Sequence, residues 1–301
     1  MEYRQLGRTD LKVSAIGLGA VTFSREIDET TAFPIMGHAL DRGINLIDTA
    51  EAYNKGGSET AVGVWLKRSG KRDKVVLATK LIPPLTAERI PLAAEDGLRR
   101  LQTDVIDLYQ IHAFDKNTPL DESLDALGKL VQAGKVRYLG CSNFAAWQLC
   151  KALWRADVHG WPRLESVQPN YNLAIRDIEA ELLPLCADQQ IGVISYSPLG
   201  AGFLTGKYSQ SWTAPRAPAL TLCLTTGKFT RTRPRCSAWK SCAPKPRKPA
   251  SPWSNWPWPG CWVSRASPQP SLAAARSQVD QAFDAAAMGL SPELRAEFNS
   301  W

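Results

Sequence analysis

Residues 105–143 read VIDLYQIHAFDKNTPLDESLDALGKLVQAGKVRYLGCSN, with an apolar, β-branched run at each end and a helical pattern between. Thr118 is a good N-cap, Pro119 suits the first helical position, and Gly134 is expected to end the helix. Apolar residues recur at the spacing of one helix face: Leu120, Leu124, Leu127, Leu130 and Val131. The order strand, helix, strand predicts a βαβ unit with parallel strands.

Similar apolar runs recur roughly every 30 residues along the first two thirds of the chain, and helical periodicity fills the intervals. The runs lie at 15–18, 45–50, 74–80, 105–112, 136–143, 166–172 and 192–199. An open doubly wound sheet would need a topological switch, and nothing in the spacing suggests one. The sequence therefore predicts an α/β protein with a closed (β/α)8 TIM barrel, as a single domain over residues 1–301.

Composition narrows the class of protein further. Hydrophobic residues make up 44% of the 301 residues, which is enough for one large core. No apolar run is long enough for a membrane span, and the first residues are too polar for a secretion signal. The seven cysteines are an odd number without a CxxC pair, and Cys141, Cys150 and Cys186 are expected to be buried small residues. We therefore expect a cytoplasmic protein without a membrane partner, a disulfide framework or a metal site.

Four polar residues follow the ends of three neighbouring strands, and these ends converge on one face of a barrel. They are Asp48, Tyr53, Lys80 and His112. Taken singly, Asp48 or Lys80 would suit a solvated strand end. His112 would suit a structural histidine, and Tyr53 a packed tyrosine. Together they suit acid-assisted carbonyl reduction, in which Lys80 lowers the pKa of Tyr53 from about 10 and Asp48 holds Lys80. His112 would donate to the substrate oxygen, and a cofactor would supply the hydride.

Two phosphate-binding motifs are excluded near residue 200. The glycines Gly200 and Gly202 lack the third glycine of a dinucleotide fingerprint and follow the seventh strand rather than the first. A P-loop is excluded as well, because its first glycine is missing and Tyr208 stands where Ser or Thr would bind magnesium. Any nucleotide cofactor is therefore expected to bind in another way.

Six linked motifs resemble the aldo-keto reductase family in order and spacing. They are LIDTAEAYNKGGSE, VVLATK, DLYQIHAFD, AGKVRYLGCSNF, SVQPNYN and ISYSPLGAGFLTGKY, all within about residues 1–208. The resemblance implies a TIM barrel that reduces a small-molecule aldehyde or ketone with NADPH. It also implies that Asp48, Tyr53, Lys80 and His112 are the catalytic tetrad, with Tyr53 as the proton donor.

The same resemblance implies a set of cofactor-binding residues. In isolation, several of them would equally suit a helix N-cap or the core. The set is Ser142, Asn143 and Gln168 at the nicotinamide amide, Tyr196 stacked on the nicotinamide, Ser197, Leu199 and Gly202 beside the pyrophosphate, and Arg276 at the adenosine phosphate. At Arg276, two residues of the family's usual spacing are missing.

The family's pattern stops at residues 209–272, a Pro-, Trp- and Arg-rich segment where the seventh helix and eighth strand are expected. The closely spaced prolines forbid a regular helix and interrupt a central strand, so we expect both elements to be disrupted. We interpret the segment as an out-of-frame translation; a natural insertion is the alternative. Loss of the eighth strand would leave the edges of the first and seventh strands unpaired, with weaker NADPH binding and lower stability.

Two other classes of function stay open. A non-catalytic or cofactor-impaired nucleotide-binding barrel could act as a redox sensor or a partner-binding subunit. Nucleic-acid binding is suggested by the formal net charge of +7 and by residues 189–279, which contain twelve basic and no acidic residues. We expect no specific nucleic-acid partner, because an unordered basic segment binds polyanions without specificity.

Overall fold

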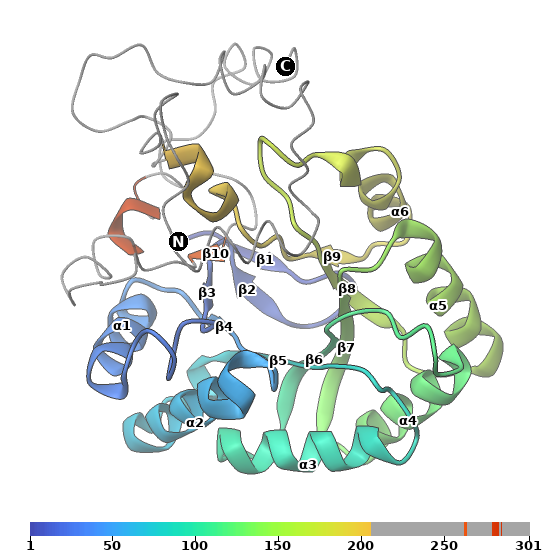
Figure 1. Cartoon of the computed structure of the whole chain (residues 1–301), viewed down its shortest axis with the longest axis horizontal. Helices are drawn as coiled ribbons and strands as arrows, with labels where there is room; N and C mark the ends of the chain where they lie inside the picture. The colour runs from blue at the N-terminus through green and yellow to red at the C-terminus, as the bar shows by residue number, and fades with distance from the viewer. Residues whose placement is uncertain (206–261, 264–278, 283, 285–301) are drawn as a thin grey trace.

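The computed structural model describes residues 1–205, 262–263, 279–282 and 284, and Figure 1 shows a curled central sheet surrounded by helices. Every neighbouring pair in this sheet is parallel, in the order β10-β3-β4-β5-β6-β7-β8-β9. The strands are β3 (Gly17–Gly19), β4 (Leu46–Asp48), β5 (Val76–Leu81), β6 (Ile106–Ile111), β7 (Val136–Ser142), β8 (Leu164–Gln168), β9 (Gly192–Val193) and β10 (Trp262–Val263). The seven predicted strands are confirmed, and the architecture is that of a partial (β/α)8 barrel.

The strand at the position of the eighth barrel strand is β10, which is only two residues long. It pairs with β3 through Trp262 opposite Gly17 and Val263 opposite Leu18. The edge of the first strand, which would be unpaired if the eighth strand were absent, is therefore paired over two residues. In the part of the chain that the structure describes, no ladder joins β9 to β10. The expected seventh helix and Arg276 lie outside the described residues.

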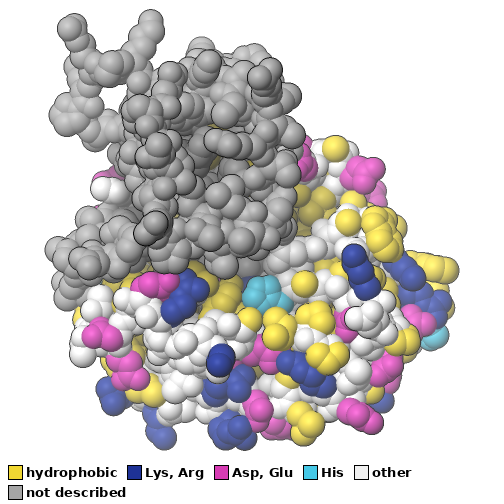
Figure 2. Space-filling view, viewed as in Figure 1, with side chains coloured by type: hydrophobic (Ala, Val, Ile, Leu, Met, Phe, Trp, Pro, Cys, Tyr) yellow, Lys and Arg dark blue, Asp and Glu magenta, His cyan; other side chains and the backbone are white. Residues whose placement is uncertain are grey.

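Helices alternate with the strands and cover the outside of the sheet (Figure 1). They are α1 (Glu29–Asp41), α2 (Gly57–Ser69), α3 (Arg89–Leu101), α4 (Leu120–Gln132), α5 (Ala146–His159) and α6 (Leu182–Asp188). Within the described ranges, no helix is long and apolar enough to cross a membrane. Charged side chains of both signs are interspersed over the visible outer surface (Figure 2).

Helix α4 shows how closely the sequence pattern predicts an element. Leu124, Leu127 and Leu130 are buried, as their spacing predicts. The predicted start is wrong by one residue, because Pro119 occupies the N-cap position. The Thr118 hydroxyl does not cap the helix; it donates to a carboxylate oxygen of Asp115 at 2.7 Å.

The three cysteines of the described chain are free, and their burial differs from the prediction at one position. Cys141 and Cys186 are buried, and burial raises the pKa of the Cys186 thiol to about 11. Cys150 is exposed, so its prediction as a buried residue is wrong. Its position on α5 places it on the outward side of the helix, together with the exposed Trp147 and Trp154.

A short antiparallel hairpin, β1 (Tyr3–Gln5) and β2 (Lys12–Ser14), precedes the barrel and was not predicted from the sequence. Its strands are three residues long, too short to show a clear alternating pattern. Leu6, Leu11 and Val13 of the hairpin are buried. They belong to one cluster with apolar side chains of the barrel interior: Leu46, Ala78, Leu108 and Ile194. The hairpin therefore closes the amino-terminal end of the barrel.

The barrel interior changes from apolar to polar along the strands. Side chains two residues apart on a strand share a face. Two residues beyond each apolar interior residue, a polar one follows on the same face: Asp48 after Leu46, Lys80 after Ala78, Gln110 after Leu108, and Tyr196 after Ile194. Hydrophobic packing thus fills the amino-terminal end of the interior, while the carboxyl-terminal end gathers groups that can react.

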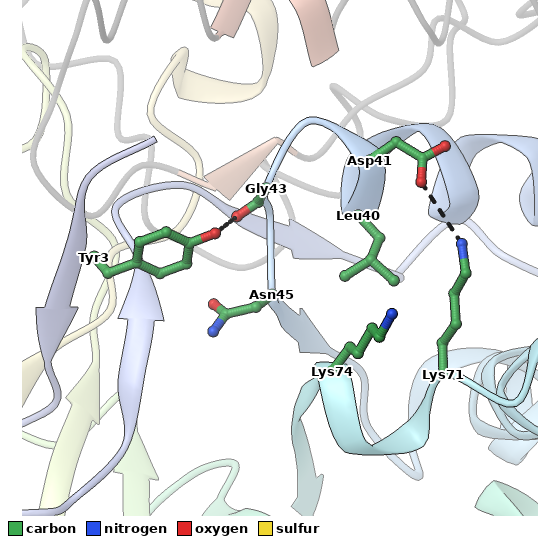
Figure 3. A pocket seen from close by; sticks show the side chains of 7 residues that line it. All are labelled: Tyr3, Leu40, Asp41, Gly43, Asn45, Lys71 and Lys74. Atoms are coloured by element: carbon green, nitrogen blue, oxygen red, sulfur yellow. Dashed lines mark hydrogen bonds and ion pairs between the residues drawn. The ribbon is translucent and has the colours of Figure 1, made fainter.

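A surface hollow of about 320 Å³ opens beside the hairpin, and seven residues line it (Figure 3). The Tyr3 hydroxyl donates to the carbonyl of Gly43 at 2.9 Å, and the Lys71 ammonium lies 3.6 Å from the carboxylate of Asp41. Asn45, which precedes β4, also lines the hollow. The hollow therefore lies at the amino-terminal end of the strands, where no predicted site residue lies.

Candidate active site

The four predicted catalytic residues come together at the carboxyl-terminal end of the sheet. Asp48 ends β4, Lys80 lies near the end of β5, and Tyr53 begins the short 3-10 helix Tyr53–Gly56 in the connection after β4. The Lys80 ammonium forms an ion pair with Asp48 and donates to the Tyr53 hydroxyl at 3.2 Å and to the carbonyl of Thr49 at 2.9 Å. The Lys80 side chain is 0% exposed and the Asp48 side chain 5%. A buried carboxylate and a buried ammonium thus form one chain of contacts with a half-buried phenol.

Two amides complete the surroundings of the Asp48 carboxylate. The side chains of Gln110 and Gln168 both donate to Asp48 Oδ1, at 3.0 and 3.1 Å, while Oδ2 faces Lys80. Burial raises the pKa of the Asp48 carboxyl, and the Lys80 charge and the two amides oppose that rise. Three donors on one carboxylate are what a buried anion requires.

The pKa values of Lys80 and Tyr53 depend on burial and on the opposing effect of neighbouring groups. Burial lowers the pKa of Lys80, but Asp48 and Tyr53 raise it more, so it lies above its ordinary value. Burial raises the pKa of Tyr53 more than the Lys80 charge lowers it. Lys80 lowers the pKa of Tyr53, as predicted, but desolvation of the phenol outweighs the ammonium, and the pKa of Tyr53 lies above its ordinary value. Tyr53 carries its proton at neutral pH.

His112 directly follows β6 and lies beside Tyr53. The two ring centroids are 5.7 Å apart, and the rings meet edge to face at 84°. Burial, with the nearby Lys80 charge, lowers the pKa of His112 to about 4, so the imidazole is neutral at pH 7. Its Nδ1 atom is buried and has no hydrogen-bond partner within the described residues. A neutral imidazole carries one N–H donor, which suits it to polarise a carbonyl oxygen.

The residues predicted to bind nicotinamide lie on the neighbouring strand ends and are linked by hydrogen bonds. The Ser142 hydroxyl donates to the carbonyl of Gln168 at 2.8 Å. The Asn143 amide donates to the carbonyl of His112 at 3.0 Å, and its Oδ1 accepts from the Tyr196 hydroxyl at 2.8 Å. These bonds tie the ends of β7 and β8 and the segment after β9 to the loop that carries His112.

The local backbone argues against the alternative interpretation of Ser142 and Asn143 as a helix cap. The N-cap of α5 is Ala145, so Ser142 and Asn143 do not cap that helix. Asn143 has φ 60°, a left-handed conformation that Asn tolerates better than most residues. Hydrogen bonds to His112 and Tyr196 hold the Asn143 side chain at the strand ends, and it does not cap the helix.

The segment predicted to lie beside the pyrophosphate turns repeatedly into left-handed backbone. Ser197, Gly200, Ala201 and Gly202 have φ values of 56°, 54°, 59° and 92°. The Gly202 N–H donates to the carbonyl of Leu199 at 2.9 Å, which closes a tight turn. Backbones of this kind form concave arrays of N–H groups that suit anions.

Gln110 is the site residue that sequence reasoning missed. The signal was present in the stretch DLYQIH, because strand alternation places Gln110 on the same face as Leu108 and His112. Only His112 was assigned, since it ends the run. The contact with Asp48 depends on how far the barrel brings β4 and β6 together, which a linear pattern does not contain.

Comparison with known proteins agrees with this fold and assigns the chain to a family of barrel enzymes. The model of the Aldo/keto reductase family matches residues 15–244, and the chain belongs to that family. The matched range extends past Tyr208, where the quoted motifs end, into the segment 209–272.

Three bacterial relatives illustrate the similarity. The chain is 43% identical over 229 residues to the uncharacterized oxidoreductase YrpG of Bacillus subtilis, with 70% of each protein covered. It is 39% identical over 226 residues to the aldo-keto reductase YhdN of the same organism, covering 71% of this chain and 66% of YhdN. It is 36% identical over 245 residues to the protein tas of Escherichia coli, covering 69% and 71%. The comparisons support a general oxidoreductase role, and members of the family generally use nicotinamide cofactors.

Proposed function

We propose that the chain reduces an aldehyde or ketone with NADPH and that Tyr53 is the proton donor. The observation that carries this proposal is the chain of contacts from the buried Asp48 and Lys80 to Tyr53, with the His112 and Tyr53 rings edge to face. It lies at the carboxyl-terminal end of parallel barrel strands, where barrel enzymes carry their active sites.

Each of the four residues has a distinct part in this chemistry. As negative charge develops on the carbonyl oxygen, Tyr53 donates its phenolic proton and Lys80 stabilises the phenolate that remains. Asp48 keeps Lys80 charged and in place. Because burial raises the pKa of Tyr53, the proton stays on the phenol until the substrate oxygen becomes basic enough to accept it. The neutral His112 donates a hydrogen bond to the same oxygen.

The residues on the other side of the site fit a nicotinamide dinucleotide. Hydroxyl and amide groups of Ser142, Asn143 and Gln168 suit a carboxamide, which both donates and accepts hydrogen bonds. Tyr196 offers an aromatic face, and the left-handed backbone at 197–202 suits a pyrophosphate. When bound, NADPH supplies the hydride. We propose NADPH rather than NADH as the cofactor because of the family resemblance, in which Arg276 lies at the adenosine phosphate.

Turnover of 4-nitrobenzaldehyde, followed by loss of NADPH absorbance, tests the proposal. We expect Tyr53→Phe to lower kcat about 10²- to 10⁴-fold, since that is the usual contribution of a general acid. Tyr138→Phe is the matched control, because the Tyr138 hydroxyl donates to Asp10 at the opposite end of the barrel. The proposal fails if both variants keep wild-type turnover or lose it equally.

A non-catalytic nucleotide-binding role is the second candidate. The chain is 34% identical over 226 residues to a probable voltage-gated potassium channel subunit beta of Arabidopsis thaliana, covering 70% of this chain and 67% of that protein. A barrel of this kind would bind NADPH to sense redox state or support a partner. Saturable NADPH binding by fluorescence, without turnover of any tested aldehyde or ketone, would favour this candidate.

A further inference from the structure

Gln110 lies inside the barrel, one interior position before His112 on the same strand face. It is 0% exposed, and its Nε2 donates to Asp48 Oδ1 at 3.0 Å. Gln168 donates to the same oxygen from β8 at 3.1 Å. The Asp48 carboxylate is therefore held on one oxygen by two amides, which leaves its other oxygen turned toward Lys80.

We propose that Gln110 is a positioning residue, which fixes the orientation of the Asp48 carboxylate and, by donating to its charged form, keeps it ionised beside Lys80. This inference rests on the proposed reductase function. Gln110 acts through Asp48, while Lys80 and Tyr53 complete the chain to the substrate oxygen.

Gly140 gives Gln110 the space that this role needs. The two residues are register partners on β6 and β7. A Cβ atom at Gly140 would lie 2.4 Å from Ser166 Oγ and 3.1 Å from Gln110 Cγ. The first distance is a clash and the second forces the glutamine to move. A glycine at this position therefore lets the Gln110 side chain lie in the interior and extend to Asp48.

The charges around Asp48 determine which way a change at Gln110 acts. Lys80 from β5 faces Asp48 directly, Tyr53 contacts Lys80, and His112 lies beside Tyr53. Arg25 adds a more distant positive charge near Tyr53. Removing a donor from a carboxylate disfavours its charged form and raises its pKa. Protonation of Asp48 would then remove the partner of Lys80 at a higher pH than in the wild type.

The test compares Gln110→Met with the control Ser166→Ala across a pH series. We expect Gln110→Met to lower kcat for 4-nitrobenzaldehyde about tenfold and to move the acid limb of the kcat profile up by about one pH unit, the effect of one lost hydrogen bond to a charge. KM for the aldehyde should change little, since Gln110 lies beneath the site. Ser166→Ala removes another buried polar group of the interior, whose Oγ has no hydrogen-bond partner within the described residues, and should leave the profile unchanged.

A second measurement does not depend on turnover. The Asp48 carboxyl is titrated by ¹³C NMR in aspartate-labelled protein, with Asp48→Asn to assign the signal. We expect a higher Asp48 pKa in Gln110→Met, and the same direction of shift in Gly140→Ala. If the wild type shows no turnover but this pKa still shifts, the reductase proposal fails and the positioning of Asp48 by Gln110 stands.

Gln110→Glu distinguishes hydrogen bonding from space filling. Beside Asp48 a glutamic acid is expected to keep its proton at low pH and to donate in place of the amide. It should therefore exceed the Met variant in kcat at low pH and lose that advantage as the pH rises. An unchanged pH profile and an unchanged Asp48 pKa in Gln110→Met would overturn the proposal, as would a Glu variant no better than Met at every pH.

Discussion

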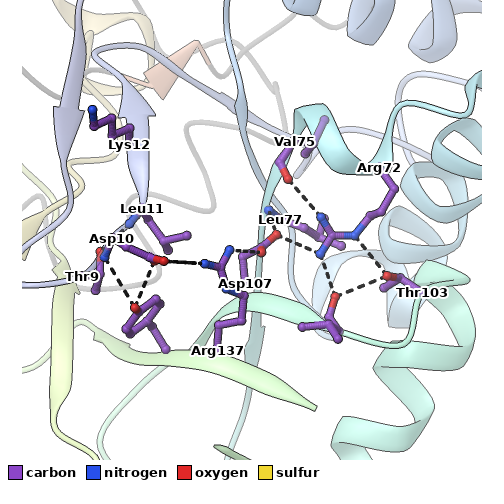
Figure 4. Close-up of polar contacts among 12 residues, drawn as sticks. Thr9, Asp10, Leu11, Lys12, Arg72, Val75, Leu77, Thr103, Asp107 and Arg137 are labelled. Atoms are coloured by element: carbon purple, nitrogen blue, oxygen red, sulfur yellow. Dashed lines mark hydrogen bonds and ion pairs between the residues drawn. The ribbon is translucent and has the colours of Figure 1, made fainter. Parts of the chain in front are cut away.

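The two ends of the barrel use similar residue types for different purposes. At the amino-terminal end, Asp107 accepts the Leu77 N–H at 2.9 Å and pairs with Arg72 at 2.8 Å and Arg137 at 3.1 Å (Figure 4). Arg137 also contacts Asp10 of the hairpin loop at 2.9 Å. Like the proposed active site, this network joins carboxylates, cations and a tyrosine.

Burial and the identity of the cation separate the two ends. Lys80 is 0% exposed, whereas the side chains of Arg72 and Arg137 are 29% and 42% exposed. The Arg72 guanidinium also donates to the carbonyls of Val75 and Val105, so it ties chain segments together. A permanently charged, forked guanidinium suits such a tie. A buried lysine has its charge set by its neighbours, which suits proton chemistry.

The largest expected effect comes from Lys80→Met. This variant leaves the buried Asp48 carboxylate without its cation, and breaking a buried pair in this way costs about 3–5 kcal/mol of unfolding free energy. Turnover should be lost as well. Urea unfolding measures the first effect, and NADPH consumption the second.

Two further variants sharpen this result. Asp48→Asn combined with Lys80→Met should regain most of the stability, because no unpaired charge remains buried, but no turnover. The exposed Lys74, which lines the hollow of Figure 3, provides the matched control Lys74→Met, expected within about 0.5 kcal/mol of the wild type. An equal cost for the two Lys→Met variants would contradict the distinction between the two ends.

The second prediction concerns acid sensitivity at the active-site end. The pKa of His112 is about 4 in the folded protein, and about 6.5 is expected when it is unfolded. Between these values the unfolded chain binds a proton that the folded chain does not. The stability is therefore complete above pH ~6.5 and is lost as the pH falls toward 4, by at most about 3 kcal/mol. Urea unfolding of His112→Gln should show a shallower loss over this window than the wild type. Parallel curves would contradict the low pKa.

The sequence predicts the barrel and the meeting of Asp48, Lys80 and His112 at one end of it, because both depend on local periodicity. The runs around Asp48, Lys80 and His112 are largely apolar and end at a polar residue, and parallel strands bring such ends to one face. Those three positions could be assigned without distances. Tyr53 followed from its place in the loop after the second strand and from the resemblance to the family.

What the sequence did not predict depends on burial and on contacts across the barrel. The hairpin strands are too short for a pattern, and Gln110 is assigned only through its contact with Asp48. The net rise of the Tyr53 pKa was not predicted, because the cost of desolvating a phenol depends on how much water the fold excludes. The Lys80 contact itself was predicted correctly.

The smallest expected effect is at the amino-terminal end, in Asp107→Asn. The amide keeps the size of the carboxylate but loses the charge that pairs with Arg72 and Arg137, so we expect a loss of about 1–3 kcal/mol of unfolding free energy. The cost stays below that of Lys80→Met because both guanidiniums reach water and Arg72 keeps its backbone carbonyl partners. Turnover of 4-nitrobenzaldehyde and its pH profile should remain those of the wild type, since this network lies at the amino-terminal end of the strands and does not contact Asp48 or Lys80. A changed pH profile in Asp107→Asn would mean that the two ends of the barrel are electrostatically coupled, and the separation of structural from catalytic charge would then fail.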